Sequence, residues 1–118
     1  MAYNSYGNRF LKDTPVVMNL VIINVLVFLI QSLFDGKEAT ITMKLALWSI
    51  DSGEFKPYQL VTHMFTHGGF AHILFNMFAL WSFGTWLEKS WGPKKFLFFY
   101  LACGLTAAAA QLLFSNVP

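Results

Sequence analysis

Residues 62–76 read "THMFTHGGFAHILFN", and this stretch governs the interpretation of the whole chain. Its imidazole and carboxamide side chains are His63, His67, His72 and Asn76. No Asp, Glu, Lys or Arg occurs between Lys56 and Glu88, so these groups lie in a long apolar run. A polar group in hydrocarbon without a partner is costly, so the four side chains must face other helices or water.

The composition of the 118-residue chain indicates a membrane protein. Hydrophobic residues make up 56% of the chain and charged residues only 12%, against roughly 25% charged in ordinary globular proteins. Two further stretches, 14–34 and 96–118, also lack charged residues. Each of the three stretches holds at least the ~20 residues that a helix needs to cross the hydrocarbon core. We therefore predict an all-α membrane protein with three spanning helices.

The first span is predicted over residues 15–34, "PVVMNLVIINVLVFLIQSLF". Pro15 suits a first helical turn, and Asp35-Gly36 closes the apolar run. A cleaved signal peptide is the alternative, but its apolar region should be only about 7–15 residues long and end in a small-residue cleavage site. The sequence "LIQSLFDGKE" offers no convincing site, which favours an uncleaved helix.

The middle charge-free stretch is too long for one helix. Its first part carries Pro57, Gly68 and Gly69, which interrupt helices. We predict a partly immersed connection over residues 35–69, followed by a spanning helix over 70–87. Irregular backbone at that depth must be buried in protein or line a cavity that contains water.

The third span is predicted over residues 95–114. Gly104 and Ala108 lie four residues apart, a spacing that lets helix backbones approach closely, although both could also merely face lipid. Within the connection, Ile41, Leu45 and Trp48 share one helical face, which predicts an interfacial helix or else an ordinary loop helix.

Basic residues indicate the orientation. The tail, residues 1–14, and the segment between the second and third helices share one side of the membrane, and together they hold Arg9, Lys12, Lys89, Lys94 and Lys95. The long connection holds three lysines among four acids. The positive-inside rule therefore predicts a cytoplasmic N-terminus. The formal net charge of +2 and the lack of a basic stripe predict no nucleic-acid partner.

His72 and Asn76 are separated by four residues, so their side chains project from one face of the second helix. Two neutral hydrogen-bond donors one turn apart would suit a developing oxyanion. A structural hydrogen bond between helices is the alternative, and the pair alone does not exclude it.

A metal site is not expected. His63 and His67 are also four residues apart, but Met64 occupies the position where the metalloprotease motif has Glu. No carboxylate or cysteine lies nearby to complete a ligand set. We expect neither a metal nor an organic cofactor, and we interpret His63 and His67 as structural residues that pin the connection to its neighbours.

The array His-x3-His-x4-His-x3-Asn, followed by "WLEKSWG", resembles the rhomboid intramembrane serine proteases. The resemblance covers nearly the whole chain from about Pro15. It implies a rhomboid-like helical bundle in which residues 1–118 form the N-terminal part of one domain, with three of an expected six membrane helices. It also implies a multi-pass protein of a bacterial cytoplasmic (inner) membrane, with lipid bilayer and transmembrane substrates as partners.

The resemblance implies roles for individual residues. His72 and Asn76 match the side chains that help to form the rhomboid oxyanion hole, while His63 and His67 match structural histidines. Glu88 with Gly92 matches a motif that stabilises the cytoplasmic end of the second helix. One departure is that Tyr58-Gln59 stands where many members have Trp-Arg.

The larger departure is that the family's Ser-His dyad has no counterpart in this chain. The resemblance places the serine of a Gly-x-Ser motif on a fourth helix and the histidine on a sixth, downstream of Pro118. Ser52 and Ser82 have neither that context nor a paired base, and a serine without a base is a poor nucleophile. We expect a protease whose downstream helices are missing from this sequence and which is inactive in this form. The alternative is an inactive rhomboid-like protein that binds transmembrane helices. A transporter or channel would need charges embedded in the membrane, and the spans contain none.

Overall fold

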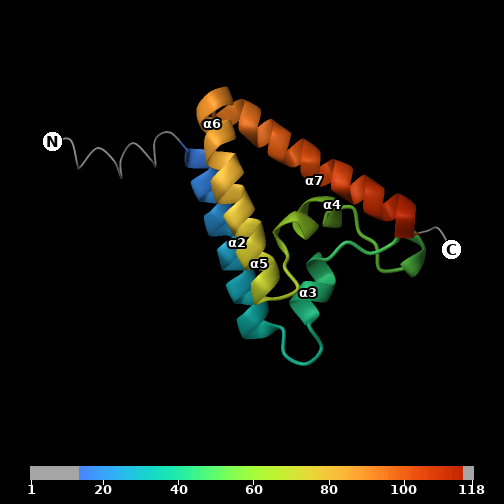
Figure 1. The fold of residues 1–118 in the computed structure, drawn as a ribbon. Coiled ribbons are helices and arrows are strands. Elements are labelled where there is room, and N and C mark those ends of the chain that lie inside the picture. Colours follow the sequence, from blue (N-terminus) through green and yellow to red (C-terminus); the bar gives the residue numbers. More distant parts are fainter. Residues whose placement is uncertain (1–13, 116–118) are drawn as a thin grey trace.

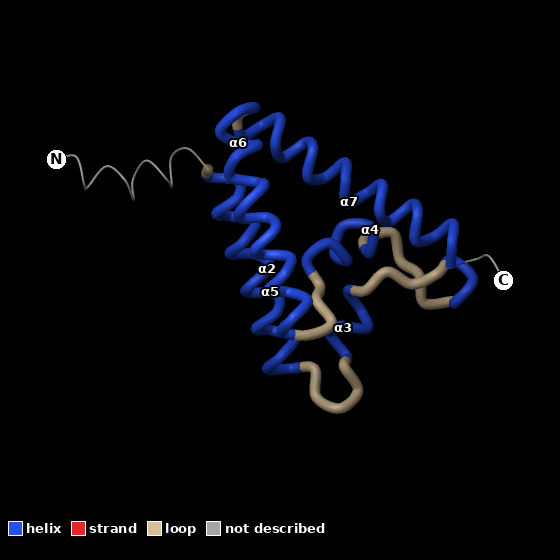
Figure 2. Tube along the Cα trace, in the orientation of Figure 1, coloured by secondary structure: helices blue, strands red, loops and turns tan. Residues whose placement is uncertain are grey.

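The computed structural model describes residues 14–115, and within them the chain forms helices and turns without strands (Figures 1 and 2). The elements are α2 (Pro15–Phe34), α3 (Thr40–Leu45), η1 (Ile50–Ser52), α4 (Gln59–Thr62), η2 (His63–Phe65), α5 (Phe70–Ala79), η3 (Leu80–Gly84), α6 (Thr85–Trp91) and α7 (Pro93–Ser115). The turn η3 is π-helical and joins α5 to α6. All of the predicted tail except Thr14 lies outside the described residues.

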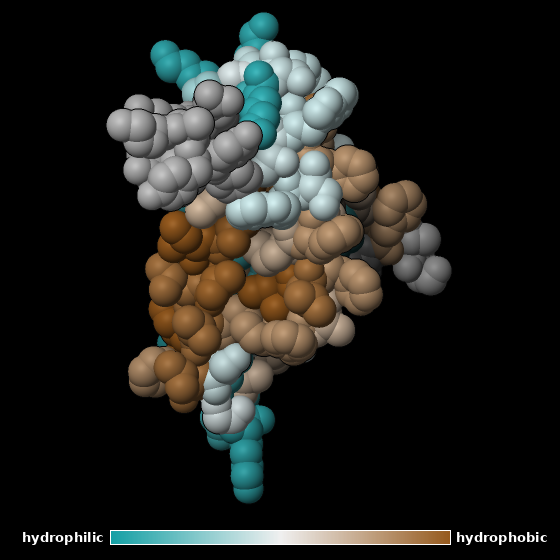
Figure 3. All heavy atoms as spheres, turned by 60° about the vertical axis from the view of Figure 1, so that its left-hand side comes forward, coloured by the Kyte–Doolittle hydropathy of each residue, from teal (hydrophilic) through white to brown (hydrophobic). Residues whose placement is uncertain are grey.

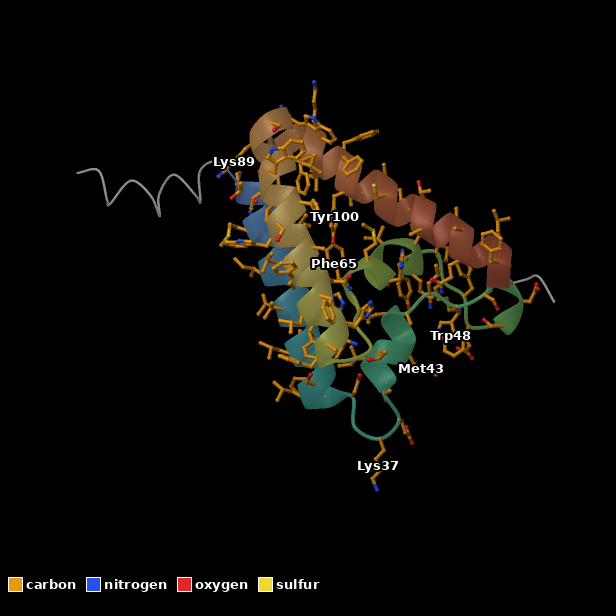
Figure 4. The ribbon with its side chains drawn as sticks, viewed as in Figure 1. Lys37, Met43, Trp48, Phe65, Lys89 and Tyr100 are labelled. Atoms are coloured by element: carbon orange, nitrogen blue, oxygen red, sulfur yellow. The ribbon has the colours of Figure 1, made fainter. Side chains whose placement is uncertain are left out.

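Three helical segments are long and apolar enough to cross a membrane: Pro15–Phe34, Phe70–Trp91 and Pro93–Phe114. On the face shown in Figure 3, hydrophobic side chains cover the middle of the molecule, and hydrophilic side chains gather at both ends. Lys37 and Lys89 lie at these opposite ends (Figure 4). The prediction of an all-α membrane protein with three spans is confirmed.

The boundary between the second and third spans differs from the sequence prediction. The second helical segment continues beyond residue 87 to Trp91, and α7 begins at Pro93 instead of residue 95. The charged residue Glu88 was expected to end the span, but its side chain is buried against α2 and leaves the helix intact. The helix ends at Gly92, whose φ of 88° is a left-handed conformation that favours glycine. Pro93 then suits the first turn of α7.

The helices α2 and α5–α6 lie side by side, and α7 slants away from them (Figure 1). Val17, Leu20 and Phe96 form the buried core where the three helical segments meet. Gly84 permits this approach, because an added Cβ would lie 3.0 Å from Val17 Cγ2 and 3.1 Å from Phe96 Cζ. The core therefore concentrates at the end of the bundle where α6 turns into α7.

The connection, residues 35–69, folds back into the angle between α7 and the other two spans (Figure 2). Gln59 is 1% exposed and holds this segment together. Its Oε1 accepts from the Trp48 backbone N–H at 3.2 Å, and its Nε2 donates to the Glu54 carbonyl at 3.1 Å. Gln59 thus organises the connection, at one of the two positions where the chain departs from the pattern that it resembles.

The structure bears on two expectations about packing: the helical face that includes Trp48, and the small residues Gly104 and Ala108. The helix α3 ends at Leu45, so the predicted helical face that included Trp48 was wrong. On α7, Ala108 is fully buried, and a Cβ on Gly104 would collide with the Met64 side chain. These small residues therefore serve packing, and at Gly104 the partner is η2 of the connection instead of another span.

Candidate functional site

His67 lies at the centre of a polar cluster between α2 and α5. Its side chain is 5% exposed, its Nε2 lies 2.9 Å from Asn24 Oδ1, and its Nδ1 lies 3.4 Å from Asn76 Nδ2. The His72 ring meets the His67 ring edge-on, with centroids 5.4 Å apart and an interplanar angle of 75°. The structure thus brings together three of the four polar residues that the sequence singled out.

The backbone of His67 is held from α2 as firmly as its ring. Gln31 Oε1 accepts from the His67 backbone N–H at 3.2 Å, and Gln31 Nε2 donates to the His67 carbonyl at 3.0 Å. The same Nε2 donates to Thr42 Oγ1 at 2.8 Å, and Thr42 in turn donates to the Asp35 carboxylate. This chain of hydrogen bonds joins α2, α3 and the segment before α5, and therefore supports the structural role expected for His67.

His63 lies outside this cluster. It begins η2, and its Nε2 is buried without a hydrogen-bond partner among the residues that the structure describes. Burial lowers the pKa of His63 and favours its neutral form. Its neighbour Met64 packs on Gly104 of α7, so this part of the connection is fixed to the third span.

A cavity of about 380 Å³ opens beside the polar cluster. Asn24, His67 and Asn76 contribute polar groups to its wall, and Tyr100 and Cys103 of α7 line it as well. Tyr100 and Phe65 point into the space between α5 and α7 (Figure 4), and their ring centroids are 6.4 Å apart. The remaining lining is mainly apolar, so the polar groups are concentrated at the end of the cavity near His67.

His72 and Asn76 are both exposed on α5, and of the two only Asn76 lines the cavity. A carboxamide carries two N–H donors. One of them is directed at His67 Nδ1, so the second is available to a ligand in the cavity. Neutral donors of this kind can stabilise a developing oxyanion.

Two further groups of residues within residues 14–115 bear on candidate chemistry: possible metal ligands and the two serines. They contain no group of three His, Cys, Asp or Glu side chains that could hold a metal ion. Ser52 and Ser82 lie in η1 and η3, and neither lines the cavity.

Glu88 and Gly92 lie at the other end of the second helix. Glu88 is 1% exposed, and its two carboxylate oxygens accept from the backbone N–H groups of Val16 and Val17, both at 2.9 Å. The Glu88 carbonyl accepts from the Gly92 N–H at 2.8 Å. The side chain therefore stabilises the start of α2, while the backbone bond closes the end of α6.

Three residues of the site were missed in the sequence: Asn24, Gln31 and Tyr100. Asn24 and Gln31 are seven residues apart in an apolar span, which places them on one helical face, and this signal could have identified them. Tyr100, whose hydroxyl interacts with the Asn24 side chain, gave no comparable signal among the many aromatic residues of its span.

Comparison with known proteins adds independent evidence. The Rhomboid domain family matches residues 54–118. The rhomboid protease GluP of Bacillus subtilis (strain 168) is 44% identical over 69 residues, which cover 58% of this chain and 13% of GluP. RHOMBOID-like protein 12, mitochondrial, of Arabidopsis thaliana is 33% identical over 103 residues, or 87% of this chain and 30% of that protein.

The rhomboid protease GlpG of Salmonella choleraesuis (strain SC-B67) is 32% identical over 103 residues, or 86% of this chain and 36% of GlpG. The chain thus spans little more than a third of these curated relatives at most. No solved structure gave a significant match. The family match over residues 54–118, together with the three spans, shows that this chain belongs to the rhomboid family.

Proposed function

We propose that the full-length protein is an intramembrane serine endopeptidase that cleaves transmembrane substrates, and that this chain supplies its oxyanion donors, His72 and Asn76. The main supporting observation is the Asn76 carboxamide, which lies in the wall of a cavity inside the spans and has one N–H left for a ligand. Two of the relatives compared above are named as rhomboid proteases.

In this proposal the nucleophilic serine and the basic histidine come from a part of the domain outside residues 1–118. The histidine takes the proton of the serine hydroxyl as the serine oxygen attacks the peptide carbonyl. The oxyanion that forms accepts hydrogen bonds from His72 and Asn76. Collapse of the intermediate expels the amine, which takes the proton from the histidine, and water then hydrolyses the acyl-enzyme.

The absence of fixed charge suits this mechanism. A carboxylate beside the oxyanion would repel it, whereas neutral imidazole and carboxamide donors stabilise it. Burial lowers the pKa of the adjacent His67, and His72 lowers it further, which favours the neutral form of the His67 ring. The chemistry requires neither metal nor cofactor.

We further propose that another helix of the same domain packs against the cavity between α5–α6 and α7 and directs side chains into it. The lining is mainly apolar, as a helix surface within a bilayer requires, and its polar groups lie where an active-site residue would be needed. The proposed setting is a bacterial inner membrane with a cytoplasmic N-terminus.

The direct test is cleavage of a transmembrane substrate by the full-length protein and its Asn76→Ala variant. Loss of one oxyanion donor should lower kcat by roughly 10²–10³ while the protein remains folded. Asn19→Ala is the matched control, because Asn19 is exposed and, within residues 14–115, donates to the carbonyl of Pro15 in its own helix. Equal activity of both variants would contradict the role of Asn76.

A second function is that of an inactive relative that binds transmembrane helices, and the apolar cavity between α5 and α7 favours it. Such a protein would crosslink to transmembrane segments through Cys103, which lines the cavity, and would not cleave them. Cleavage by the full-length wild type that is lost in Asn76→Ala would exclude this function.

A further inference from the structure

Asn24 is a fully buried polar residue on the first span, and the mechanism above leaves it without a role. It is 0% exposed in the middle of α2, where most neighbouring positions are apolar. Its Nδ2 donates to the carbonyl of Leu20 at 2.7 Å, and its Oδ1 lies 2.9 Å from His67 Nε2. Both ends of the carboxamide are therefore engaged. Its oxygen faces His67 of the connection, and the Tyr100 hydroxyl of α7 also interacts with this side chain.

The chemistry of these contacts determines the protonation of His67. Because the Leu20 carbonyl can only accept, the amide nitrogen of Asn24 must face it, and the amide oxygen must face His67. An amide oxygen also only accepts, so His67 Nε2 must carry the proton. In the neutral ring, Nδ1 is then left with a lone pair.

This lone pair faces Asn76. The Asn76 Nδ2 lies 3.4 Å from His67 Nδ1, so one amide N–H donates to it. The opposite tautomer would place two N–H groups against each other, and the carboxamide of Asn76 would have to turn its oxygen toward His67. The proton position on His67 therefore decides which end of the Asn76 carboxamide is fixed.

The helix α2 also fixes where His67 can lie. Gln31, seven residues after Asn24 on the same helix, accepts from the His67 backbone N–H and donates to its carbonyl. Ring and backbone of His67 are thus both held by one rigid element, as accurate placement of a reacting group requires.

We propose that Asn24 is a positioning residue: through the proton on His67 Nε2 it orients the Asn76 carboxamide, so that the second N–H of Asn76 is directed at the substrate oxyanion. This inference rests on the proposed function for its catalytic consequence. The effect on the His67 tautomer does not depend on catalysis and can be measured separately.

The test compares wild type, Asn24→Leu and Asn24→Thr as full-length protein in lipid bilayers. Nitrogen-15 NMR of labelled histidines reports which ring nitrogen carries the proton, and His67→Gln identifies the His67 signals. Wild type should show protonated Nε2 and bare Nδ1. Asn24→Leu removes the acceptor and should give a mixture of both tautomers.

Asn24→Thr should restore the wild-type tautomer at least in part. Its hydroxyl can donate to the carbonyl four residues earlier and still accept from Nε2. This variant decides the question if Asn24→Leu does not fold. Asn19→Leu is the matched control, since Asn19 is exposed on the same helix and should leave the His67 signals unchanged.

The kinetic measurement determines kcat and KM separately, because a positioning role should change kcat alone. Asn24→Leu should lower kcat by roughly tenfold, as is common for residues that orient a reacting group, and leave KM unchanged. A wild-type tautomer in Asn24→Leu, or protonation only at Nδ1 in Asn24→Thr, would overturn the inference. Absence of cleavage by wild type would instead refute the proposed function and leave the NMR result standing.

Discussion

Glu88 is the residue on which the start of α2 depends. A helix N-terminus leaves its first backbone N–H groups without intrahelical partners. Pro15 has no N–H, so Val16 and Val17 carry the next donors, and the Glu88 carboxylate accepts from both at 2.9 Å. A negative charge also suits the positive end of the helix dipole. One side chain thus caps the first span from the second.

Glu88→Gln should therefore destabilise the bundle. The amide retains one acceptor but turns an NH₂ group toward a backbone donor, which leaves a buried N–H unsatisfied. The free energy of unfolding should fall by about 1–3 kcal/mol. Denaturant unfolding in bicelles measures this, and hydrogen exchange at the Val16 and Val17 amides should accelerate.

Lys95→Gln is the control for Glu88→Gln, because Lys95 is exposed near the same end of the molecule. Unchanged exchange at Val16 and Val17 in Glu88→Gln would show that the carboxylate does not cap α2.

Residue chemistry was predictable from the sequence only in part. His67, His72 and Asn76 stood out because polar groups are rare in an apolar run. The same reasoning would have identified Asn24 and Gln31, the two residues that α2 contributes to the site. The partners of Glu88 could not be predicted, because they lie 71 and 72 residues away in the chain and no local pattern records that contact.

At the scale of elements, the crossing of α2, η3 and α7 depends on Gly84. Its missing side chain lets Val17 and Phe96 approach. Both neighbours are packed in the core and cannot move away without disturbing it. Gly84→Ala should therefore overpack the crossing and lower the free energy of unfolding by about 1–3 kcal/mol. Denaturant unfolding in bicelles again measures the change.

Gly104→Ala is the instructive comparison. The added methyl group would collide with the Met64 side chain, which is flexible and can rotate aside. This variant should be destabilised less than Gly84→Ala. The reverse order would show that the connection, and not the helix crossing, limits stability.

Helical spans were more predictable than the connection between them. Charge-free stretches fix where a helix can cross a membrane, so α2 and α7 follow from composition. The end of α3 at Leu45 does not follow from the sequence, because hydrogen bonds made by Trp48 override the helical periodicity there. The Trp48 backbone N–H donates to Gln59 Oε1, and the Trp48 indole donates to the Met43 carbonyl.

At the scale of the molecule, the two polar ends should lie on opposite sides of the membrane. Lys37 and Lys89 mark these ends (Figure 4). Lys89 lies in the last turns of α6, and Lys94 and Lys95 lie in the first turn of α7. These basic residues predict that the Lys89 end is cytoplasmic. Single cysteines at Lys37 and Ser90, in a background without Cys103, should be labelled by an impermeant maleimide from outside only at position 37. Labelling only at position 90 would reverse the orientation.

The central claim is that this chain forms the oxyanion side of a serine protease. Reaction with a fluorophosphonate probe, followed by peptide mass spectrometry, tests it most directly. The full-length protein should be labelled on a serine outside residues 1–118, and Asn76→Ala should slow that labelling because the phosphoryl oxygen also needs the oxyanion donors. The 118-residue chain alone should remain unlabelled, since neither Ser52 nor Ser82 has a base to activate it. Stoichiometric labelling of Ser52 or Ser82 would contradict the account.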